Sequence, residues 1–273
     1  MLLTADIGNT SICVGAYKGD TLVFTARLYT DRHKSADEYT LSLKDILTLN
    51  GISQQDFSGA IISSVVPEVT DAFSLAAEKI TGKKPVTVGK EHNGNLKIEI
   101  LPVSALGADL IAASIGAISK YPLPCLVADL GTATKIIVID KNGIFRGCTI
   151  SPGVKVSLDA LSKNASLLPE ISLKRPERAI GENTVECMQS GIVFGTAGML
   201  DGLIKRIKKE LDEGEVTVVA TGGYSKAISE CCETEMIYDE NLLLDGLRVI
   251  YERAKGQGPR AEEHPSGAVS SSQ

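Results

Sequence analysis

The sequence predicts an α/β protein built from two related domains, each a mixed β-sheet flanked by helices, with a cleft between the domains. Short apolar runs with the two-residue period of strands alternate with longer runs that have the period of helices. One order of strands around an acidic glycine turn occurs twice, which is typical of an internal duplication. The 273 residues, of which 43% are hydrophobic, suffice for two domains of ordinary size.

The first half is expected to begin with a meander of three strands. The turn Asp6-Ile7-Gly8-Asn9-Thr10-Ser11 joins the first strand to the second, and Lys18-Gly19-Asp20 joins the second to the third. A helix, a short apolar strand and a second helix follow. These six elements are expected at residues 2–5, 12–17, 21–28, 35–49, 59–66 and 68–79.

The second half repeats this order from Cys125. Its acidic glycine turn, Asp129-Leu130-Gly131-Thr132-Ala133-Thr134, aligns Asp129 with Asp6. Strands are expected at 126–128, 135–140, 144–150 and 216–220, and helices at 154–161, 184–211 and from Tyr224. The predicted domains are residues 1–118 and 119–255. Residues 256–273, rich in Gly, Pro, Ser and Glu, are expected to be a disordered tail or a segment left from expression.

Composition argues against several classes of partner. The net charge is −6 with a pI of about 5.3, and no basic cluster outruns the neighbouring acids, so neither nucleic acid nor an anionic lipid surface is expected to bind. We expect no signal segment and no stretch long enough to span a bilayer. The six cysteines are scattered rather than grouped in motifs, which indicates reduced core residues in a cytoplasmic protein.

The two acidic glycine turns carry the predicted chemistry. Gly8 and Gly131 allow the backbone to approach a ligand closely, and outward N–H groups in such turns are donors for anions. Further donors are the side chains of Asn9, Thr10, Thr132 and Thr134. The turns are therefore expected to hold a polyphosphate from two sides, which leaves Asp6 to hold Mg²⁺ through water. One such turn alone is also typical of an Asx-turn at a hairpin, but two in register favour phosphate binding.

Two further motifs in the sequence are compatible with more than one role. Gly222 and Gly223 follow a buried strand and precede a helix, so they suit packing against a flat ring such as adenine, a helix N-terminus that meets an anion, or a plain turn. Asp109 lies near the start of a helix rich in small residues. It is either a solvated acid that the helix dipole stabilises or the base that accepts a proton from an attacking hydroxyl.

Together these segments resemble the type III pantothenate kinases. Nine motifs occur in that family's order and cover the chain from its first strand to about Lys255. They are Asp6 to Thr10, Asp31 to Tyr39, Ser63 to Pro67, Gly107 to Asp109, Asp129 to Thr134, Ile150 to Gly153, Ile180 to Thr184, Met188 to Gly191 and Thr221 to Gly223.

The resemblance implies an actin/hexokinase-like (ribonuclease H-like) fold and a homodimer. It also implies ATP-dependent phosphorylation of pantothenate to 4′-phosphopantothenate, the first step of coenzyme A biosynthesis. By the same resemblance, the segment from Asp6 to Cys13 contacts ATP together with Thr132. We also expect Gly222 and Gly223 at the nucleotide, on the argument from close packing against adenine.

The resemblance assigns the remaining roles as follows. Asp109 is the general base, and Asp129 helps to hold a monovalent cation, K⁺ or NH₄⁺. Gly107 and Ala108 belong to the acceptor motif, and Thr184 contacts the acceptor from the partner subunit.

Four positions depart from the family's pattern. Leu110 stands where an arginine would pair with the acceptor carboxylate, and Ile100 stands where the family places a tyrosine. Lys135 replaces a hydroxyl or small residue, and Glu170 replaces an arginine. Three functions remain open: a pantothenate kinase that holds the carboxylate in another way, a kinase for a different, less acidic alcohol, and a nucleotide-binding homologue without catalysis.

Lys135 itself has three interpretations. Its ammonium group would occupy the site of the monovalent cation beside Asp129, reach the acceptor carboxylate in place of the arginine missing at Leu110, or face solvent at the start of a strand. In the first case the enzyme needs no added potassium.

Overall fold

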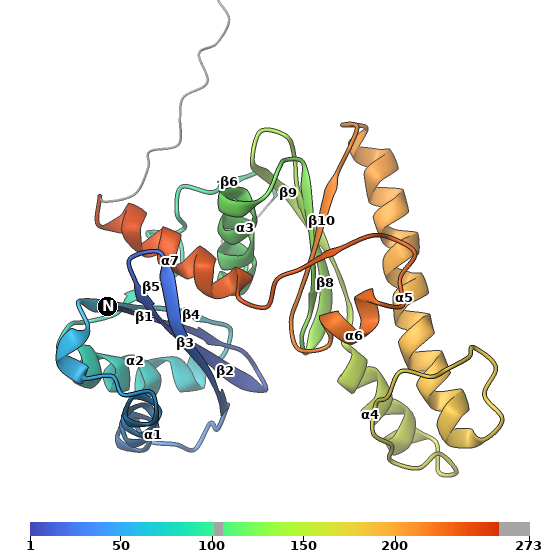
Figure 1. Cartoon of the computed structure of the whole chain (residues 1–273), viewed down its shortest axis with the longest axis horizontal. Coiled ribbons are helices and arrows are strands. Elements are labelled where there is room, and N and C mark those ends of the chain that lie inside the picture. Colours follow the sequence, from blue (N-terminus) through green and yellow to red (C-terminus); the bar gives the residue numbers. More distant parts are fainter. Residues whose placement is uncertain (101–105, 257–273) are drawn as a thin grey trace, which may run out of the picture.

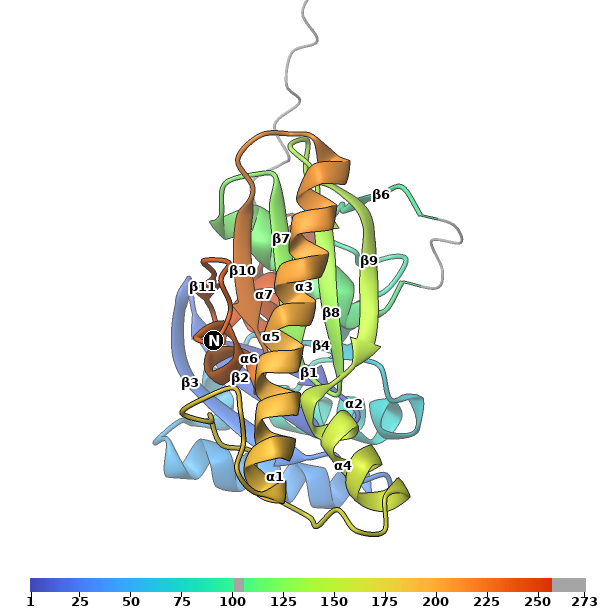
Figure 2. The same ribbon diagram turned by 90° about the vertical axis from the view of Figure 1, so that its right-hand side faces the viewer.

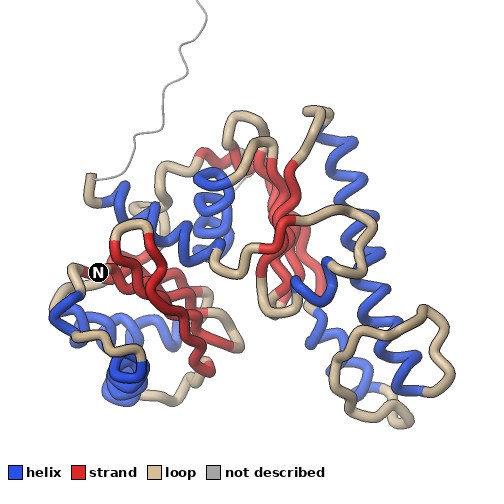
Figure 3. Tube along the Cα trace, in the orientation of Figure 1, coloured by secondary structure: helices blue, strands red, loops and turns tan. Residues whose placement is uncertain are grey.

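The computed structural model describes residues 1–100 and 106–256 (Figure 1). The predicted tail, 256–273, lies outside these residues except for Gly256. The described chain forms two β-sheets, one mainly from each half of the sequence, with helices between the sheets and on their outer faces (Figures 1 and 3).

The first sheet has five strands in the order β3-β2-β1-β4-β5. Its central strand β1 is antiparallel to β2 and parallel to β4. The strands are β1 (Leu2–Ile7), β2 (Ser11–Lys18), β3 (Thr21–Tyr29), β4 (Gly59–Ser64) and β5 (Val86–Thr87). The helices of this half are α1 (Ala36–Leu49), the short η1 (Gln54–Asp56) and α2 (Pro67–Thr81). Ser35 and Glu38 form a capping box that fixes the start of α1.

The second sheet repeats the strand order of the first. Its order is β11-β10-β7-β8-β9-β6, in which β7, β8, β9, β10 and β11 take the places of β1 to β5. The strands are β6 (Lys97–Ile98), β7 (Cys125–Leu130), β8 (Ala133–Ile139), β9 (Ile144–Pro152), β10 (Thr217–Thr221) and β11 (Ile237–Tyr238). The shared order confirms the repeated meander that the sequence predicts. β6, an added edge strand, comes from the first half of the chain and pairs with β9.

The helices complete a five-layer arrangement. α1 and α2 cover the outer face of the first sheet, and α3 (Ala108–Lys120) and α7 (Leu242–Ala254) lie between the two sheets (Figure 1). α4 (Val154–Asn164), α5 (Thr184–Leu211) and α6 (Ser225–Ser229) cover the outer face of the second sheet, where Figure 2 shows α5 running in front of the strands. Three hydrophobic clusters fill the spaces between layers. We call the one around α3 and α7 the central cluster; it includes Ile61, Ile115, Val127 and Leu247.

Alternation along the central strands turns two acidic residues toward the space between the sheets. In β7, Val127 packs in the central cluster, whereas Leu126 packs in the cluster on the outer face. Asp129 has the parity of Val127 and therefore faces inward. In β1, Leu2 packs in the central cluster, and Asp6 shares its parity. Asp6 and Asp129 thus lie at the carboxyl ends of equivalent strands and on the inner face of each sheet.

α3 and α7 cross in close contact through two glycines. A Cβ atom on Gly246 would collide with the carbonyl group of Ala112, and a Cβ atom on Gly116 would collide with the carbonyl oxygen of Leu242. The two helix backbones can approach this closely only because both positions lack a side chain. The crossing fixes α3, and with it Asp109 in the first turn of α3, relative to both sheets.

The predicted elements are largely confirmed, with specific omissions. The predicted elements do not include β5, β6, β11, η1 and α7. β5, β6 and β11 have two residues each, which is too few to show a period. The helix expected from Tyr224 is the five-residue α6, after which the chain turns toward β11.

α5 corrects one expectation about membranes. By length and composition it is able to cross a bilayer, although no segment was expected to do so. Core helices of globular proteins pass the same test, and Met188, Ile192 and Leu200 of α5 are buried in the cluster against the second sheet. We therefore interpret α5 as a core helix.

Candidate active site

The two acidic glycine turns meet, although they come from different halves of the chain. Thr10 Oγ1 and Thr132 Oγ1 lie 3.1 Å apart, within hydrogen-bonding distance. Asn9, the neighbour of Thr10, is exposed, and its Oδ1 accepts a long hydrogen bond of 3.5 Å from Arg32. Two of the predicted polyphosphate donors, Thr10 and Thr132, therefore meet, and Asn9 adjoins Thr10 in the chain. Thr134 does not join them, because it is buried opposite Leu130 and shares the face of the sheet that packs against the outer helices.

Gly8 and Gly131 shape the two turns and do not offer their own N–H groups to a ligand. The Gly8 N–H donates to the carbonyl oxygen of Ser11 at 3.0 Å, and the Gly131 N–H donates to the carbonyl oxygen of Ala133 at 3.2 Å. Both N–H groups close their own turns. The backbone donors that suit an anion are consequently those of the residues that follow each glycine.

The third glycine turn packs against the end of β7. Gly222 has φ of 95°, a left-handed conformation that favours glycine, and a Cβ atom there would lie 2.8 Å from Asp129 Oδ1. A Cβ atom on Gly223 would lie 3.5 Å from the guanidinium of Arg27, which comes from β3 of the other sheet. The Gly222-Gly223 turn therefore packs against Asp129, the first residue of the acidic glycine turn in the second half.

Each inward aspartate lies beside a hydroxyl on the neighbouring parallel strand. Asp6 is in register with Ser63 of β4, and Asp129 is in register with Thr221 of β10. Ser63 and Thr221 are buried, and neither hydroxyl oxygen has a hydrogen-bond partner among the described residues. Buried polar atoms are nearly always paired, so this pair indicates contact with a ligand, an ion or water. Neither hydroxyl has a predicted role, although a hydroxyl at the same strand position in both repeats is a usable signal in the sequence.

The surroundings of Asp6 disfavour its charged form. Its Oδ1 is buried and has no hydrogen-bond partner in the described chain. Burial, and next the repulsion of Asp109, raise the pKa of Asp6 to about 7. The hydroxyl of Ser63 is close enough to lower this pKa but is not in hydrogen-bonding geometry, and Lys135 also lowers it. Asp6 therefore suits a cation that would stabilise its carboxylate.

Asp109 lies in the first turn of α3, after the N-cap residue Gly107 and the first helical residue Ala108. Its Oδ1 accepts a hydrogen bond of 2.8 Å from the backbone N–H of Leu110. A Cβ atom on Gly107 would lie 2.5 Å from the same oxygen, so glycine at this position leaves room for the carboxylate. The helix start and the glycine together hold Asp109 toward the space between the sheets.

Lys135 joins Asp109 to Asp129. Its Nζ lies 2.5 Å from Asp109 Oδ2 and 2.9 Å from Asp129 Oδ2. The Lys135 side chain is only 13% exposed, so the interpretation in which it faces solvent is wrong. Burial lowers the pKa of the ammonium group, but the two carboxylates outweigh it and the net shift is upward. Burial raises the pKa of Asp129, and Lys135 opposes that rise.

The acidic side chains near Asp6 suit a Mg²⁺ ion that takes only part of its coordination from the protein and the rest from phosphates and water. Among the described residues, no group of three or more His, Cys, Asp or Glu side chains forms a complete cage for a metal ion. Mg²⁺ that bridges phosphates takes one or two carboxylates and keeps several waters. The partnerless Oδ1 of Asp6 fits such a contact.

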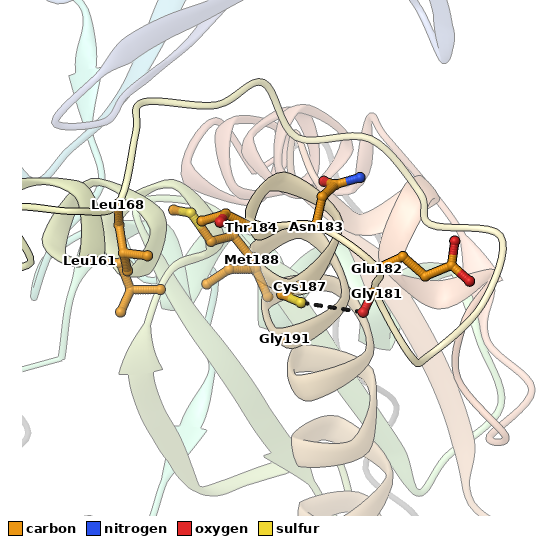
Figure 4. Close-up of a pocket in the computed structure, with 10 residues that line it drawn as sticks. Leu161, Leu168, Gly181, Glu182, Asn183, Thr184, Cys187, Met188 and Gly191 are labelled. Atoms are coloured by element: carbon orange, nitrogen blue, oxygen red, sulfur yellow. Dashed lines mark hydrogen bonds between the residues drawn. The ribbon is translucent and has the colours of Figure 1, made fainter.

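The residues expected at the acceptor lie in two different places. Leu110 is 7% exposed and packs in the central cluster, and Ile100 packs against the same cluster. Thr184 lies apart, at the start of α5, where it lines a cavity of about 740 Å³ that also contacts Leu161 and Leu168 (Figure 4). The Asp109 side of the site and Thr184 are therefore not brought together within one chain.

Similar solved structures support the fold. The activator of the 2-hydroxyisocaproyl-CoA dehydratase from Clostridium difficile, with bound ADPNP, has a TM-score of 0.58 at 14% identity, over 99% of both chains. Component A of the (R)-2-hydroxyglutaryl-CoA dehydratase from Acidaminococcus fermentans has a TM-score of 0.56 at 16% identity, over 93% of this chain and 98% of its own. With the duplicated strand order, these similarities confirm the predicted actin/hexokinase-like fold.

Relatives in sequence are closer. The family model for type III pantothenate kinase matches residues 2–206. The type III pantothenate kinase of Exiguobacterium sp. AT1b is 40% identical over 253 residues, which cover 93% of this chain and 99% of that protein. The type III pantothenate kinase of Roseiflexus castenholzii is 41% identical over 252 residues, 92% of this chain and 98% of that protein. On these matches, this chain belongs to the type III pantothenate kinase family.

Proposed function

We propose that this protein transfers the γ-phosphate of ATP to an alcohol group, with pantothenate as the acceptor and 4′-phosphopantothenate as the product. The reaction would be the first step of coenzyme A biosynthesis. The relatives support this proposal, because they carry that name and match almost the whole chain. The structural observation that carries it is the meeting of the two acidic glycine turns at Thr10 and Thr132.

In this proposal the phosphates of ATP lie between the two turns. The nucleotide-binding residues would be Asp6, Gly8, Asn9, Thr10, Gly131, Thr132, Gly222 and Gly223. Asp6 would hold Mg²⁺, which would supply positive charge against the phosphates. Asp129, which the resemblance assigns to a cation, lies too close to Lys135 to be the first choice for Mg²⁺.

Asp109 is the proposed base. The acceptor oxygen forms a bond to the γ-phosphorus while the bond from that phosphorus to the leaving oxygen of ADP breaks, and the hydroxyl proton passes to the Asp109 carboxylate. Lys135 engages Asp109 Oδ2. The acceptor hydroxyl must therefore approach the carboxylate from a side that the ammonium group leaves open.

A second candidate acceptor is an alcohol without a carboxylate. Leu110 occupies the position of the family's arginine, and its side chain is buried among apolar residues. An isobutyl group cannot replace the two hydrogen bonds of a guanidinium to a carboxylate. Loss of one such charge-assisted contact corresponds to about 1.5 to 3 kcal/mol, or roughly a ten- to hundredfold weaker binding of pantothenate.

The proposed enzyme is a cytoplasmic homodimer. Thr184 lies apart from Asp109 in its own chain, so a role in acceptor binding requires that it reach the site of a partner subunit. α5 presents three exposed glycines at helical spacing, Gly191, Gly195 and Gly198, which would allow a second helix to pack closely. A monomer by light scattering at micromolar concentration would remove the cross-subunit site.

The test is an assay of the purified chain with MgATP and a panel of alcohols. The panel contains pantothenate, pantoate, pantetheine and a simple sugar, with ADP release and product mass as readouts. We expect phosphorylation of pantothenate at a typical kinase rate. Preference for an uncharged alcohol would support the second candidate, and ATP binding without turnover on any alcohol would indicate a nucleotide-binding homologue without catalysis.

A further inference from the structure

Three carboxylates converge between the two sheets, and one lysine lies among them. Asp109 and Asp129 share Lys135 as a contact, and Asp6 ends the equivalent strand of the other sheet, where repulsion by both acids contributes to its raised pKa. Lys135 is in direct contact with Asp109 and Asp129. It therefore provides a positive charge at the point where the negative charges are densest.

The charge balance of this site favours a cation besides Mg²⁺. Ionised together, the three acids carry three negative charges, and a polyphosphate adds more at the same place. Even if one Mg²⁺ offset two of the three carboxylate charges, one carboxylate charge would remain before the phosphate charge is counted. The ammonium group of Lys135 supplies that compensation from within the chain.

We propose that Lys135 is a built-in monovalent cation, which occupies the place beside Asp129 where a free K⁺ or NH₄⁺ would otherwise neutralise the site. The protein consequently binds MgATP, and turns over, without an added monovalent cation. This inference rests on the proposed nucleotide site but not on the identity of the acceptor.

The β-ladder fixes the ammonium group in this place. Asp129 and Lys135 are directly opposite each other in the antiparallel pair of β7 and β8, so their side chains lie on the same face. The equivalent pair in the first half is Asp6 and Cys13, whose thiol carries no positive charge. Lysine therefore occurs at this position in only one of the two repeats, next to the aspartate that the family resemblance assigns to the cation.

The contacts of Lys135 leave little room for a second cation at Asp129. The Asp129 side chain is 10% exposed, its Oδ2 is 2.9 Å from Lys135 Nζ, and its Oδ1 adjoins Gly222. An ammonium group donates three hydrogen bonds, of which two are accounted for by Asp109 and Asp129. The third donor suits a phosphate oxygen or a water at the nucleotide.

The experiment measures how the binding of MgATP depends on the cation present. Calorimetric titration with a non-hydrolysable ATP analogue and Mg²⁺, and thermal unfolding, are carried out in chloride salts of choline, sodium, potassium and ammonium at one ionic strength. The variants are Lys135→Thr, which opens the site, and Lys135→Met, which removes the charge but keeps most of the volume. Lys120→Thr is the matched control, because Lys120 also bridges two aspartates, Asp239 and Asp245, and forms no ion pair with Asp109 or Asp129.

We expect wild type to bind the analogue with the same affinity, within about twofold, in all four salts. Lys135→Thr should lose roughly tenfold or more in choline and sodium and regain affinity in potassium or ammonium. Lys135→Met should lose affinity in every salt, because its thioether blocks the site, and Lys120→Thr should show no cation dependence. Rescue by a cation distinguishes this role from a merely structural one.

The proposal is overturned if wild type already requires potassium or ammonium, or if neither cation restores Lys135→Thr. It is also overturned if Lys135→Thr keeps its cation independence and shows only a higher KM for the acceptor, which would make Lys135 the clamp for the acceptor carboxylate. Because the readout is nucleotide binding, a failure to phosphorylate pantothenate would count against the proposed function without deciding this question.

Discussion

The hydroxyl oxygens of Thr10 and Thr132 lie 3.1 Å apart, although 122 positions separate the two residues in the chain. Each belongs to the acidic glycine turn of one repeat, so this contact joins the two halves at the point where a polyphosphate is proposed to bind. The pair closes the duplicated turns on each other, and each hydroxyl is able to donate to a phosphate oxygen instead of to its counterpart.

Replacement of Thr132 by valine should weaken ATP binding with little effect on folding. The change removes one donor at an exposed position, and loss of one hydrogen bond to a charged group corresponds to roughly tenfold in affinity. Calorimetric titration of Thr132→Val with a non-hydrolysable ATP analogue and Mg²⁺ measures this. Thr25→Val, at an exposed position on β3, is the control. Unchanged affinity in Thr132→Val would mean that the hydroxyls only hold the two halves together.

Asp109→Asn should abolish transfer but leave ATP binding nearly unchanged. Removal of a general base typically lowers the rate by about 10² to 10⁴, whereas the nucleotide is held by other residues. Steady-state turnover and analogue binding are measured on the same preparation. Asp245→Asn is the control, since it breaks a comparable lysine–aspartate contact, with Lys120, outside the site. If Asp109→Asn kept more than about a tenth of wild-type turnover, another residue would have to be the base.

The stability of the protein should depend on pH through Asp6. The pKa of this carboxyl group is about 7 in the folded chain and close to its ordinary value of 3.8 in the unfolded chain. Between these values the unfolded state releases a proton that the folded state retains, so the free energy of unfolding falls as pH rises through this window. Asp6→Asn removes the effect.

Urea unfolding at pH 5.5 and pH 8.5 measures this effect. We expect the stabilisation by Asp6→Asn to be larger at pH 8.5 by about 2 kcal/mol. Addition of MgATP should reduce the difference, because a cation stabilises the ionised form of wild type but has no carboxylate to bind in the variant. An equal effect of the substitution at both pH values would show that Asp6 has an ordinary pKa.

Leu110→Arg should destabilise the protein by a few kcal/mol. Leu110 is 7% exposed in the central cluster, so a guanidinium at this position either loses its hydration or forces the start of α3 to move. Leu110→Met, which conserves volume, should cost less than about 1.5 kcal/mol. Thermal unfolding gives both values, and the KM for pantothenate is measured in parallel. A stable Leu110→Arg protein with a lower KM would instead place position 110 at the acceptor.

Periodicity and hairpin register in the sequence were sufficient to predict the meander strands and part of the candidate site. The two-residue period predicts that Asp6 and Asp129 close equivalent strands, and hairpin register is enough to put Lys135 opposite Asp129. The contact of Lys135 with Asp109 could not be predicted in this way, because it depends on where α3 packs. That position is set by Gly116 and by contacts with α7, which are separated from Asp109 in sequence and carry no local signal.

α7 also imposes an order on the making of the protein. It lies on the inner face of the first sheet, against strands that precede it by more than 170 residues, and residues 242–254 leave the ribosome only after both sheets have been translated. Until α7 is made, it cannot cover Leu2 and Ile61. The nascent first half therefore presents an apolar face to solvent or to a chaperone. The core of the first half is therefore complete only after α7 has left the ribosome.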